Sequence, residues 1–164
     1  MKIPKNTVRT PYPSPLGPMT LAASDIELVG AWFTDEAHLP DLCAYPQQTD
    51  HPLLRQAAAQ LSEYFAGQRT RFELPLNLST GTVFQNAVWQ ALLDIQFGAT
   101  RSYGCVSAQI GKPSAVRAVG AAIGRNPLSI IVPCHRVIGA HGDLTGYAGG
   151  LHRKTALLQL EGAD

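Results

Sequence analysis

The residues best suited to chemistry in this 164-residue chain are Cys134 and His135, which stand side by side after Pro133. The apolar run Ile130–Val132 before them predicts a buried extended strand that Pro133 ends and orients. Burial alone keeps a thiol protonated, so Cys134 needs a base or a positive field to act as a nucleophile. Neighbours on an extended strand point to opposite faces, so contact between Cys134 and His135 requires a bend or a bridging water.

The other two cysteines, Cys43 and Cys105, complete an odd number without any CxxC pair. Neither a disulfide scaffold nor a structural zinc site is therefore expected. The His and Cys residues between positions 38 and 51 are too loosely spaced to predict a metal site, so no metal is expected there. By itself, the Cys134–His135 pair fits an inert buried thiol beside a hydrogen-bonded histidine, and it also fits a Cys–His hydrolase.

The composition predicts a folded chain, because 45% of its residues are hydrophobic and 15% are charged. No apolar run approaches the roughly 20 residues of a membrane span, and the N-terminus lacks the apolar core of a secretory signal, so a cytoplasmic protein without a membrane partner is expected. The net charge is only +1, yet residues 98–160 hold seven basic residues against one acid. That basic half suits a nucleic-acid surface or an ordinary solvated face.

The first eighty residues predict a small α/β layer. Its expected strands are Thr7–Tyr12, Met19–Ala23, Glu27–Thr34 and the short Phe72–Leu76. A helix is expected to follow Asp50 as its cap, with Pro52 just inside it and Gly67 at its end. Nothing in this unit points to chemistry.

The second half is predicted to be mostly helical. Thr82 and Gln85 have the spacing of a capping box before an apolar helical pattern. Further helices are expected over Ser102–Ile110, over Ala115–Ile123 with Ser114 as cap, and over Arg153–Leu160. The first two of these are joined by a tight turn containing Gly111, which suggests a helix-turn-helix.

The stretch Pro133-Cys134-His135-Arg136-Val137 resembles the active-site motif of the O6-alkylguanine-DNA alkyltransferases, also called methylated-DNA–protein-cysteine methyltransferases. Further motifs of the family occur in the same order: Arg101-Ser102-Tyr103-Gly104, Ala115-Val116-Arg117-Ala118-Val119-Gly120, Arg125-Asn126-Pro127, Thr145-Gly146-Tyr147-Ala148-Gly149-Gly150 and Leu157–Gly162. The resemblance implies an α+β protein. Residues 1–78 would form a small ribonuclease-H-like α/β domain, and residues 79–164 a helical domain holding the helix-turn-helix and the thiol.

The resemblance also implies an activity, which is direct-reversal repair of O6-alkylguanine, with O4-alkylthymine left open. The alkyl group lies inside the duplex, so the nucleotide is rotated out into a pocket. Cys134 then takes the alkyl carbon once and irreversibly, after His135 and Glu161 have deprotonated it through a water. The resemblance implies that this chemistry needs no cofactor and no metal. Tyr103 would give a proton or hydrogen bond to the departing base. The alternatives are a non-catalytic helix-turn-helix lesion sensor and the Cys–His hydrolase.

The partner implied is alkylated double-stranded DNA, bound through its minor groove by a monomer, with cooperative binding left open. The DNA-binding residues expected from the resemblance are Arg117, Ala118, Gly120, Lys112, Arg101 and Gly104. The family uses the arginine at Arg117 to enter the base stack. Small residues such as Gly120 let the helix approach the groove closely, although packing against another helix would favour them as well. Phosphate contacts from basic side chains would weaken with salt.

The expected pocket residues are Val137, Asn126, Tyr147 and Ala148. In the family, the backbone carbonyls at Cys134 and Val137 accept hydrogen bonds from the guanine amino group, and loop amides face O6. Asn126 matches the hinge between the second helix and the cysteine segment. Ala148 stands where some members have serine, so any contact with O6 there must come from the main chain.

Overall fold

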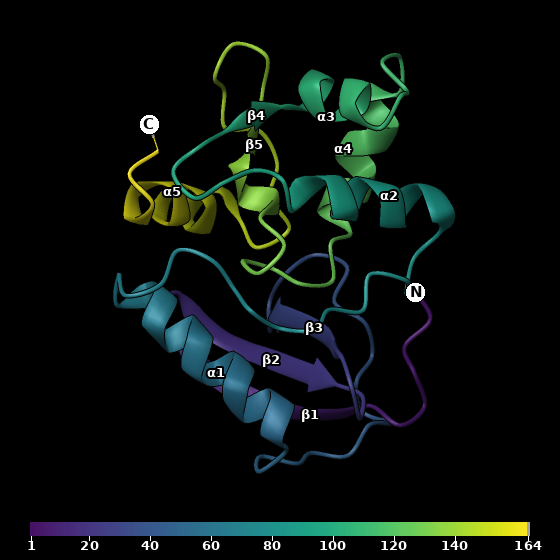
Figure 1. Ribbon diagram of the computed structural model, residues 1–164, viewed down its shortest axis with the longest axis vertical. Helices are drawn as coiled ribbons and strands as arrows, with labels where there is room; N and C mark the ends of the chain where they lie inside the picture. Colours follow the sequence, from purple (N-terminus) through teal and green to yellow (C-terminus); the bar gives the residue numbers. More distant parts are fainter. Residues whose placement is uncertain (164) are drawn as a thin grey trace.

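The N-terminal half is built on a three-stranded antiparallel sheet in a computed structural model that describes residues 1–163 (Figure 1). The strands are β1 (Val8–Ser14), β2 (Gly17–Ala23) and β3 (Leu28–Phe33), in that order. The three strands predicted here are therefore confirmed. Every residue of β3 is buried. One edge of β3 pairs with β2, and the other forms a bridge from Ala31 to Leu128 of the C-terminal half.

Helix α1 (Pro52–Phe65) packs on this sheet and contacts all three strands. It ends as predicted, with Gly67 in the left-handed region at φ 75°. The predicted cap, Asp50, is wrong by one position, because the cap is His51, whose Nδ1 accepts a hydrogen bond from the Leu53 amide at 3.1 Å. The residue before a proline is held in an extended conformation, which is the conformation that a cap requires.

The strand predicted over Phe72–Leu76 does not form. The segment makes a single isolated bridge, from Leu28 to Leu76, although it runs beside β3. Its backbone contributes the Pro75 carbonyl, which accepts from the Leu28 amide at 2.7 Å. Pro75 has no amide hydrogen to donate in return, so a regular ladder cannot continue through it.

Up to residue 163, the C-terminal half, in the upper part of Figure 1, contains four α-helices and a short parallel ladder. These elements are α2 (Val83–Leu92), β4 (Arg101–Ser102), α3 (Tyr103–Gln109), α4 (Val116–Gly124), β5 (Val137–Ile138) and α5 (Leu151–Leu160). The predicted capping box of α2 is confirmed, with reciprocal bonds between Thr82 and Gln85 at 3.1 and 3.0 Å. Among residues 1–163, none of the helices has the length and apolar character that crossing a membrane would need.

Helices α3 and α4 contact each other and are joined by a tight turn, as the helix-turn-helix prediction requires. Gly111 in this turn has a φ of 76°, a conformation that glycine adopts without strain. The predicted cap of α4, Ser114, is wrong: the cap position is Ala115, which offers no side-chain acceptor. A hydrogen bond from the Ala115 amide to the Lys112 carbonyl, at 2.9 Å, keeps Ser114 inside the preceding turn.

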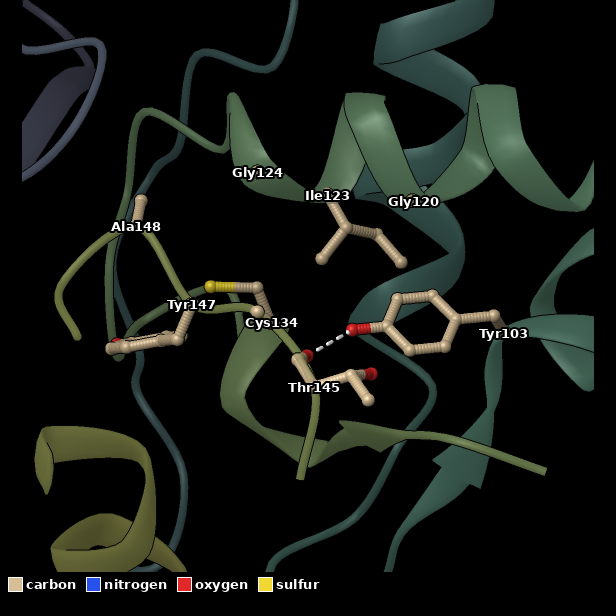
Figure 2. Close-up of a pocket in the computed structure, with 9 residues that line it drawn as sticks. Tyr103, Gly120, Ile123, Gly124, Cys134, Thr145, Tyr147 and Ala148 are labelled. Carbon is tan, nitrogen blue, oxygen red and sulfur yellow. Dashed lines mark hydrogen bonds between the residues drawn. The ribbon is translucent and has the colours of Figure 1, made fainter. Parts of the chain in front are cut away.

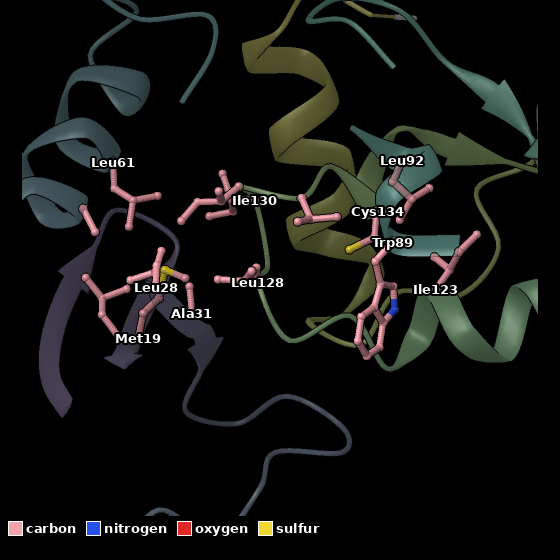
Figure 3. Packing of buried hydrophobic residues seen from close by; sticks show 14 of the residues in the cluster. Met19, Leu28, Ala31, Leu61, Trp89, Leu92, Ile123, Leu128, Ile130 and Cys134 are labelled. Atoms are coloured by element: carbon pink, nitrogen blue, oxygen red, sulfur yellow. The ribbon is translucent and has the colours of Figure 1, made fainter. Parts of the chain in front are cut away.

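One hydrophobic core runs through both halves (Figure 3). Met19, Leu28 and Leu61 form its N-terminal side, and Trp89, Leu92 and Ile123 form its C-terminal side. Leu128 and Ile130 lie between these two groups, so the segment that leads to Cys134 is packed from both sides.

The prediction of a buried strand over Ile130–Val132 is wrong, because this buried segment is a turn. The chain pairs with β3 just before it, through bonds from the Ala31 amide to the Pro127 carbonyl (2.8 Å) and from the Ser129 amide to the Ala31 carbonyl (2.9 Å). Ile130 then takes a φ of 74°, which reverses the chain. Tertiary pairing and burial on two sides therefore override the strand preference of this sequence.

Candidate active site

Cys134 begins a single turn of 3-10 helix, Cys134–Arg136, instead of ending a strand. The chain therefore bends at Cys134 and His135, so the rule that neighbours on a strand point to opposite faces does not apply to them. Cys134 is 5% exposed, and it lines a cavity of about 240 Å³ between α3, α4 and the loop before α5 (Figure 2). The cavity is lined by Tyr103, Gly120, Ile123, Gly124, Cys134, Thr145, Gly146, Tyr147 and Ala148.

Burial raises the pKa of the Cys134 thiol from 9.0 to about 11, so the sulfur is protonated at neutral pH in the absence of substrate. Two neighbours act against this effect, the side-chain amide of Asn126 and the positive charge of Lys154. Asn126 is itself fixed, because its side chain donates to the Val132 carbonyl at 2.8 Å and accepts from the Leu128 amide at 3.0 Å. The predicted hinge residue thus holds the turn that carries the thiol.

His135 is fully buried and lies against Glu161, with 2.7 Å between Nε2 and Oε2. Arg136 donates to both oxygens of the same carboxylate, from Nε at 2.7 Å and from Nη2 at 3.0 Å. The Tyr64 hydroxyl of α1 adds a hydrogen bond to Oε2 at 2.5 Å. Burial opposes ionisation of this carboxyl, but the bonds from His135 and Arg136 outweigh it and lower the pKa of Glu161 from 4.5 to about 2.

These contacts determine the tautomer of His135. Burial lowers the pKa of His135 despite the adjacent carboxylate, so the ring is neutral. Since an ionised Glu161 can only accept, Nε2 carries the hydrogen and Nδ1 carries the lone pair. Nδ1 is buried and has no partner among residues 1–163. The site therefore contains a neutral imidazole whose free basic nitrogen belongs to the residue after the thiol.

The far wall of the cavity is set by Tyr103 and by the loop of residues 145–149. The Tyr103 hydroxyl donates to the Thr145 carbonyl at 2.7 Å (Figure 2). Lys154, fully buried on α5, donates to the carbonyls of Thr145 and Gly146, both at 3.2 Å. Its ammonium lies 5.9 Å from the centre of the Tyr103 ring. Burial lowers the pKa of Lys154, and the nearby Cys134 counteracts that shift.

Five residues expected at the site line the cavity: Cys134, Tyr103, Gly120, Tyr147 and Ala148. Two expected pocket residues, Val137 and Asn126, are buried behind it and do not line it. The remaining DNA-binding candidates are exposed on β4, α3, α4 and the intervening turn, and they are Arg101, Gly104, Lys112, Arg117 and Ala118.

Several residues of the site were missed in the sequence. Arg136 stands inside the recognised motif, but its bonds to Glu161 could not be inferred without the fold. Tyr64 belongs to the stretch Tyr64-Phe65-Ala66-Gly67, which loosely resembles the family, but nothing in that stretch indicates a bond to Glu161. Lys154 was noted only as one of the basic residues of the second half. Glu36 was also missed: burial raises the pKa of this carboxyl to about 7, although the Phe33 amide and the Ser129 hydroxyl both donate to it.

Two family models match this chain. Residues 7–78 match the ribonuclease-like domain of 6-O-methylguanine DNA methyltransferase, and residues 83–163 match its DNA-binding domain. The chain is 49% identical over 148 residues to a protein of Mycobacterium leprae, covering 90% of this chain and 88% of the relative. A Methanosarcina acetivorans protein is 46% identical over 155 residues, covering 93% and 96%. Both are named methylated-DNA–protein-cysteine methyltransferase.

The fold is similar to that of solved structures. A crystal structure of Mycobacterium tuberculosis OGT in complex with DNA superimposes with a TM-score of 0.87 at 47% identity, covering 94% of this chain and 92% of that one. An archaeal O6-methylguanine-DNA methyltransferase, at 20% identity and a TM-score of 0.56, shares the fold. With both family models and these relatives matched over nearly the whole sequence, the chain belongs to the 6-O-methylguanine DNA methyltransferase family.

Proposed function

We propose that this protein repairs O6-alkylguanine in DNA by moving the alkyl group to Cys134. The sulfur forms a bond with the alkyl carbon, the bond between that carbon and O6 breaks, and its electron pair stays on the guanine oxygen. The observation that carries this assignment is the single buried thiol in the cavity, beside a histidine whose basic nitrogen is free. Membership of the family supports the same reaction.

Removal of the thiol proton is assigned to His135. With Nε2 bonded to Glu161, only Nδ1 is available as the base, and a water between Nδ1 and the sulfur would carry the proton. The carboxylate of Glu161 then stabilises the imidazolium that forms. A thiol whose pKa is about 11 needs this assistance, because the thiolate is the nucleophile.

Tyr103 is assigned to the leaving group. Its hydroxyl faces the cavity and donates to Thr145 in the absence of substrate, so a purine in the cavity would compete for that hydrogen. Donation to the departing base stabilises the charge that develops there. The product is a thioether, and no group in the cavity can break its carbon–sulfur bond, so each molecule acts once.

DNA binding is assigned to the exposed basic face of the helix-turn-helix. Arg117 on α4 would fill the space left by the rotated nucleotide, and Lys112 and Arg101 would contact phosphates. The exposed Ala118 and the half-buried Gly120 would let α4 approach the minor groove closely, and the exposed Gly104 near the start of α3 is assigned to the same binding surface. We assign binding to a monomer.

The pocket residues complete this assignment. The backbone carbonyls of Cys134 and Val137 would accept hydrogen bonds from the guanine amino group, and the amides beside Tyr147 and Ala148 would face O6. Asn126 holds the turn between α4 and the cysteine. We place the domain boundary between residues 78 and 79, with the chemistry in the second domain.

The test is the intact mass of the protein after incubation with a duplex containing O6-methylguanine. We expect a gain of one methylene group per chain, mapped to Cys134, and no gain in Cys134→Ala. The exposed Cys105 provides the matched control, since Cys105→Ala keeps the gain. A parent protein that binds the lesion without gaining mass would be a sensor. Repeated turnover of an ester or amide would indicate the hydrolase, and either result would overturn the proposal.

The role of Arg117 has its own test. Arg117→Ala should slow reaction with the duplex far more than reaction with free O6-benzylguanine, which needs no rotation out of a base stack. Arg71→Ala is the control, because this exposed arginine lies in the N-terminal half. Equal losses on the two substrates would count against base rotation by Arg117.

A further inference from the structure

Three consecutive residues of the N-terminal half reach across to the active-site region. They follow β3, and we name the segment Asp35–Ala37 the β3 turn. Asp35 accepts a hydrogen bond from Arg153 of α5 at 2.7 Å. Glu36 accepts one from Ser129, on the segment that leads to Cys134, at 3.1 Å. The Ala37 amide donates to the carbonyl of Ala148, in the cavity wall, at 3.0 Å.

Arg153 is the centre of this junction. Arg153 is 5% exposed, and its guanidinium lies 4.1 Å from the centre of the Phe33 ring at the end of β3. Nε donates to the Leu16 carbonyl in the β1–β2 hairpin at 2.8 Å, and Nη1 donates to the Gly149 carbonyl at 3.0 Å. One planar side chain thus joins the hairpin, the β3 turn and the wall of the cavity. The fixed fork of an arginine is suited to several acceptors at once.

The loop of residues 145–149 has all five carbonyls occupied. Lys154 donates to the carbonyls of Thr145 and Gly146, and the Gly150 amide donates to the Tyr147 carbonyl at 2.9 Å. The Ala37 amide donates to the Ala148 carbonyl, and Arg153 donates to the Gly149 carbonyl. By contrast, within residues 1–163 the amides of this loop donate to no protein acceptor. Peptide groups fixed through their carbonyls keep their amides in fixed directions, since the two groups point oppositely across a planar peptide.

We propose that Arg153, anchored by the β3 turn, is a positioning residue for alkyl transfer. It fixes the wall of the cavity relative to Cys134 and thereby gives the N-terminal half a part in the chemistry. This inference rests on the proposed function and adds to it a residue that does not line the cavity. Displacement of a reacting group by about 1 Å can slow a reaction roughly a hundredfold, so movement of the cavity wall should lower the rate of alkyl transfer measurably.

The test compares Arg153→Met and Arg153→Lys with the parent protein, using free O6-benzylguanine over a range of concentrations. We expect Arg153→Met to lower the rate constant at saturation by about ten- to a hundredfold, since misplacement acts on the reacting step. Arg153→Lys should recover part of that loss, because an ammonium keeps the charge and some of the donors. Affinity for undamaged duplex should stay unchanged. A merely structural role would lower the folded fraction but leave the rate constant per folded molecule intact.

Arg69→Met is the matched control, because Arg69 pairs with Glu63 at 3.5 Å and donates to the Arg71 carbonyl at 3.0 Å, both in the N-terminal half, and does not line the cavity. It should therefore keep the parent rate. If Arg153→Met does not fold, Asp35→Asn takes its place, since the side chain of Asp35 is 67% exposed and the change keeps its shape. We expect a severalfold slower rate at saturation from that variant. Parent-like rates in folded Arg153→Met or in Asp35→Asn would overturn the inference. A parent protein that gains no mass would instead overturn the proposed function.

Discussion

Replacing Glu161 by glutamine should remove a large part of the stability of the folded protein. The pKa of this carboxyl falls from 4.5 to about 2 on folding, a difference of about 2.5 pH units. Each pH unit corresponds to roughly 1.4 kcal/mol, so the ionised carboxylate contributes roughly 3 kcal/mol at pH 7. Loss of one member of a buried ion pair costs a similar amount, about 3–5 kcal/mol, because the partner charge of Arg136 remains buried.

The sign of the pH dependence follows from the lowered pKa. The stability that Glu161 contributes is complete above pH 4.5 and is lost as the pH falls towards 2. The difference in free energy of unfolding between the parent and Glu161→Gln should therefore fall to less than half of its neutral value by about pH 3. Urea denaturation followed by circular dichroism measures this difference in free energy of unfolding. Glu63→Gln is the control, because its surface pair with Arg69 is worth only about 0–1 kcal/mol. A difference in free energy of unfolding below about 1 kcal/mol at pH 7, or a difference that stays the same in acid, would refute the reasoning.

Three further outcomes are expected. Thr82→Ala should lower the free energy of unfolding by about 1 kcal/mol through loss of the α2 cap, and an unchanged urea midpoint would contradict this. Lys112→Gln should reduce the slope of log affinity against log salt by about 0.9, with Lys5→Gln as an unaffected control; parallel slopes would exclude a phosphate contact. Tyr103→Phe should slow alkyl transfer about a hundredfold without weakening DNA binding, and a parent-like rate would remove Tyr103 from the leaving-group step.

The parts of the fold that were predictable are those determined by local interactions. The strands of the sheet follow from β-rich apolar runs separated by turn residues, and the start of α2 follows from the Thr82–Gln85 capping box. The turn before Cys134 was not predictable, since Ile130 and its apolar neighbours favour a strand. Its conformation depends on pairing with Ala31, about a hundred residues earlier in the chain, and on a core that both halves share.

The residues of the site also fall into a group that local motifs predict and a group that depends on long-range contacts. The motif around Cys134 and His135 identified the thiol and its neighbour, and the resemblance added Glu161. The bond from Tyr64 to Glu161 spans 97 residues and joins the two halves, so no local pattern reports it. Arg153 is a similar case, since its partners Leu16 and Asp35 lie 137 and 118 residues away. Long-range polar contacts of this kind become visible only when the chain is folded.

The burial of the nucleophile bears on how long an unused molecule survives. Peroxides and alkylating metabolites react with thiolates, and a buried thiol whose pKa is raised to about 11 presents almost none of that form. The exposed Cys43 and Cys105 meet such reagents first. Under the proposed function each molecule reacts once, through Cys134, so burial of this thiol preserves the molecule until a damaged base enters the cavity.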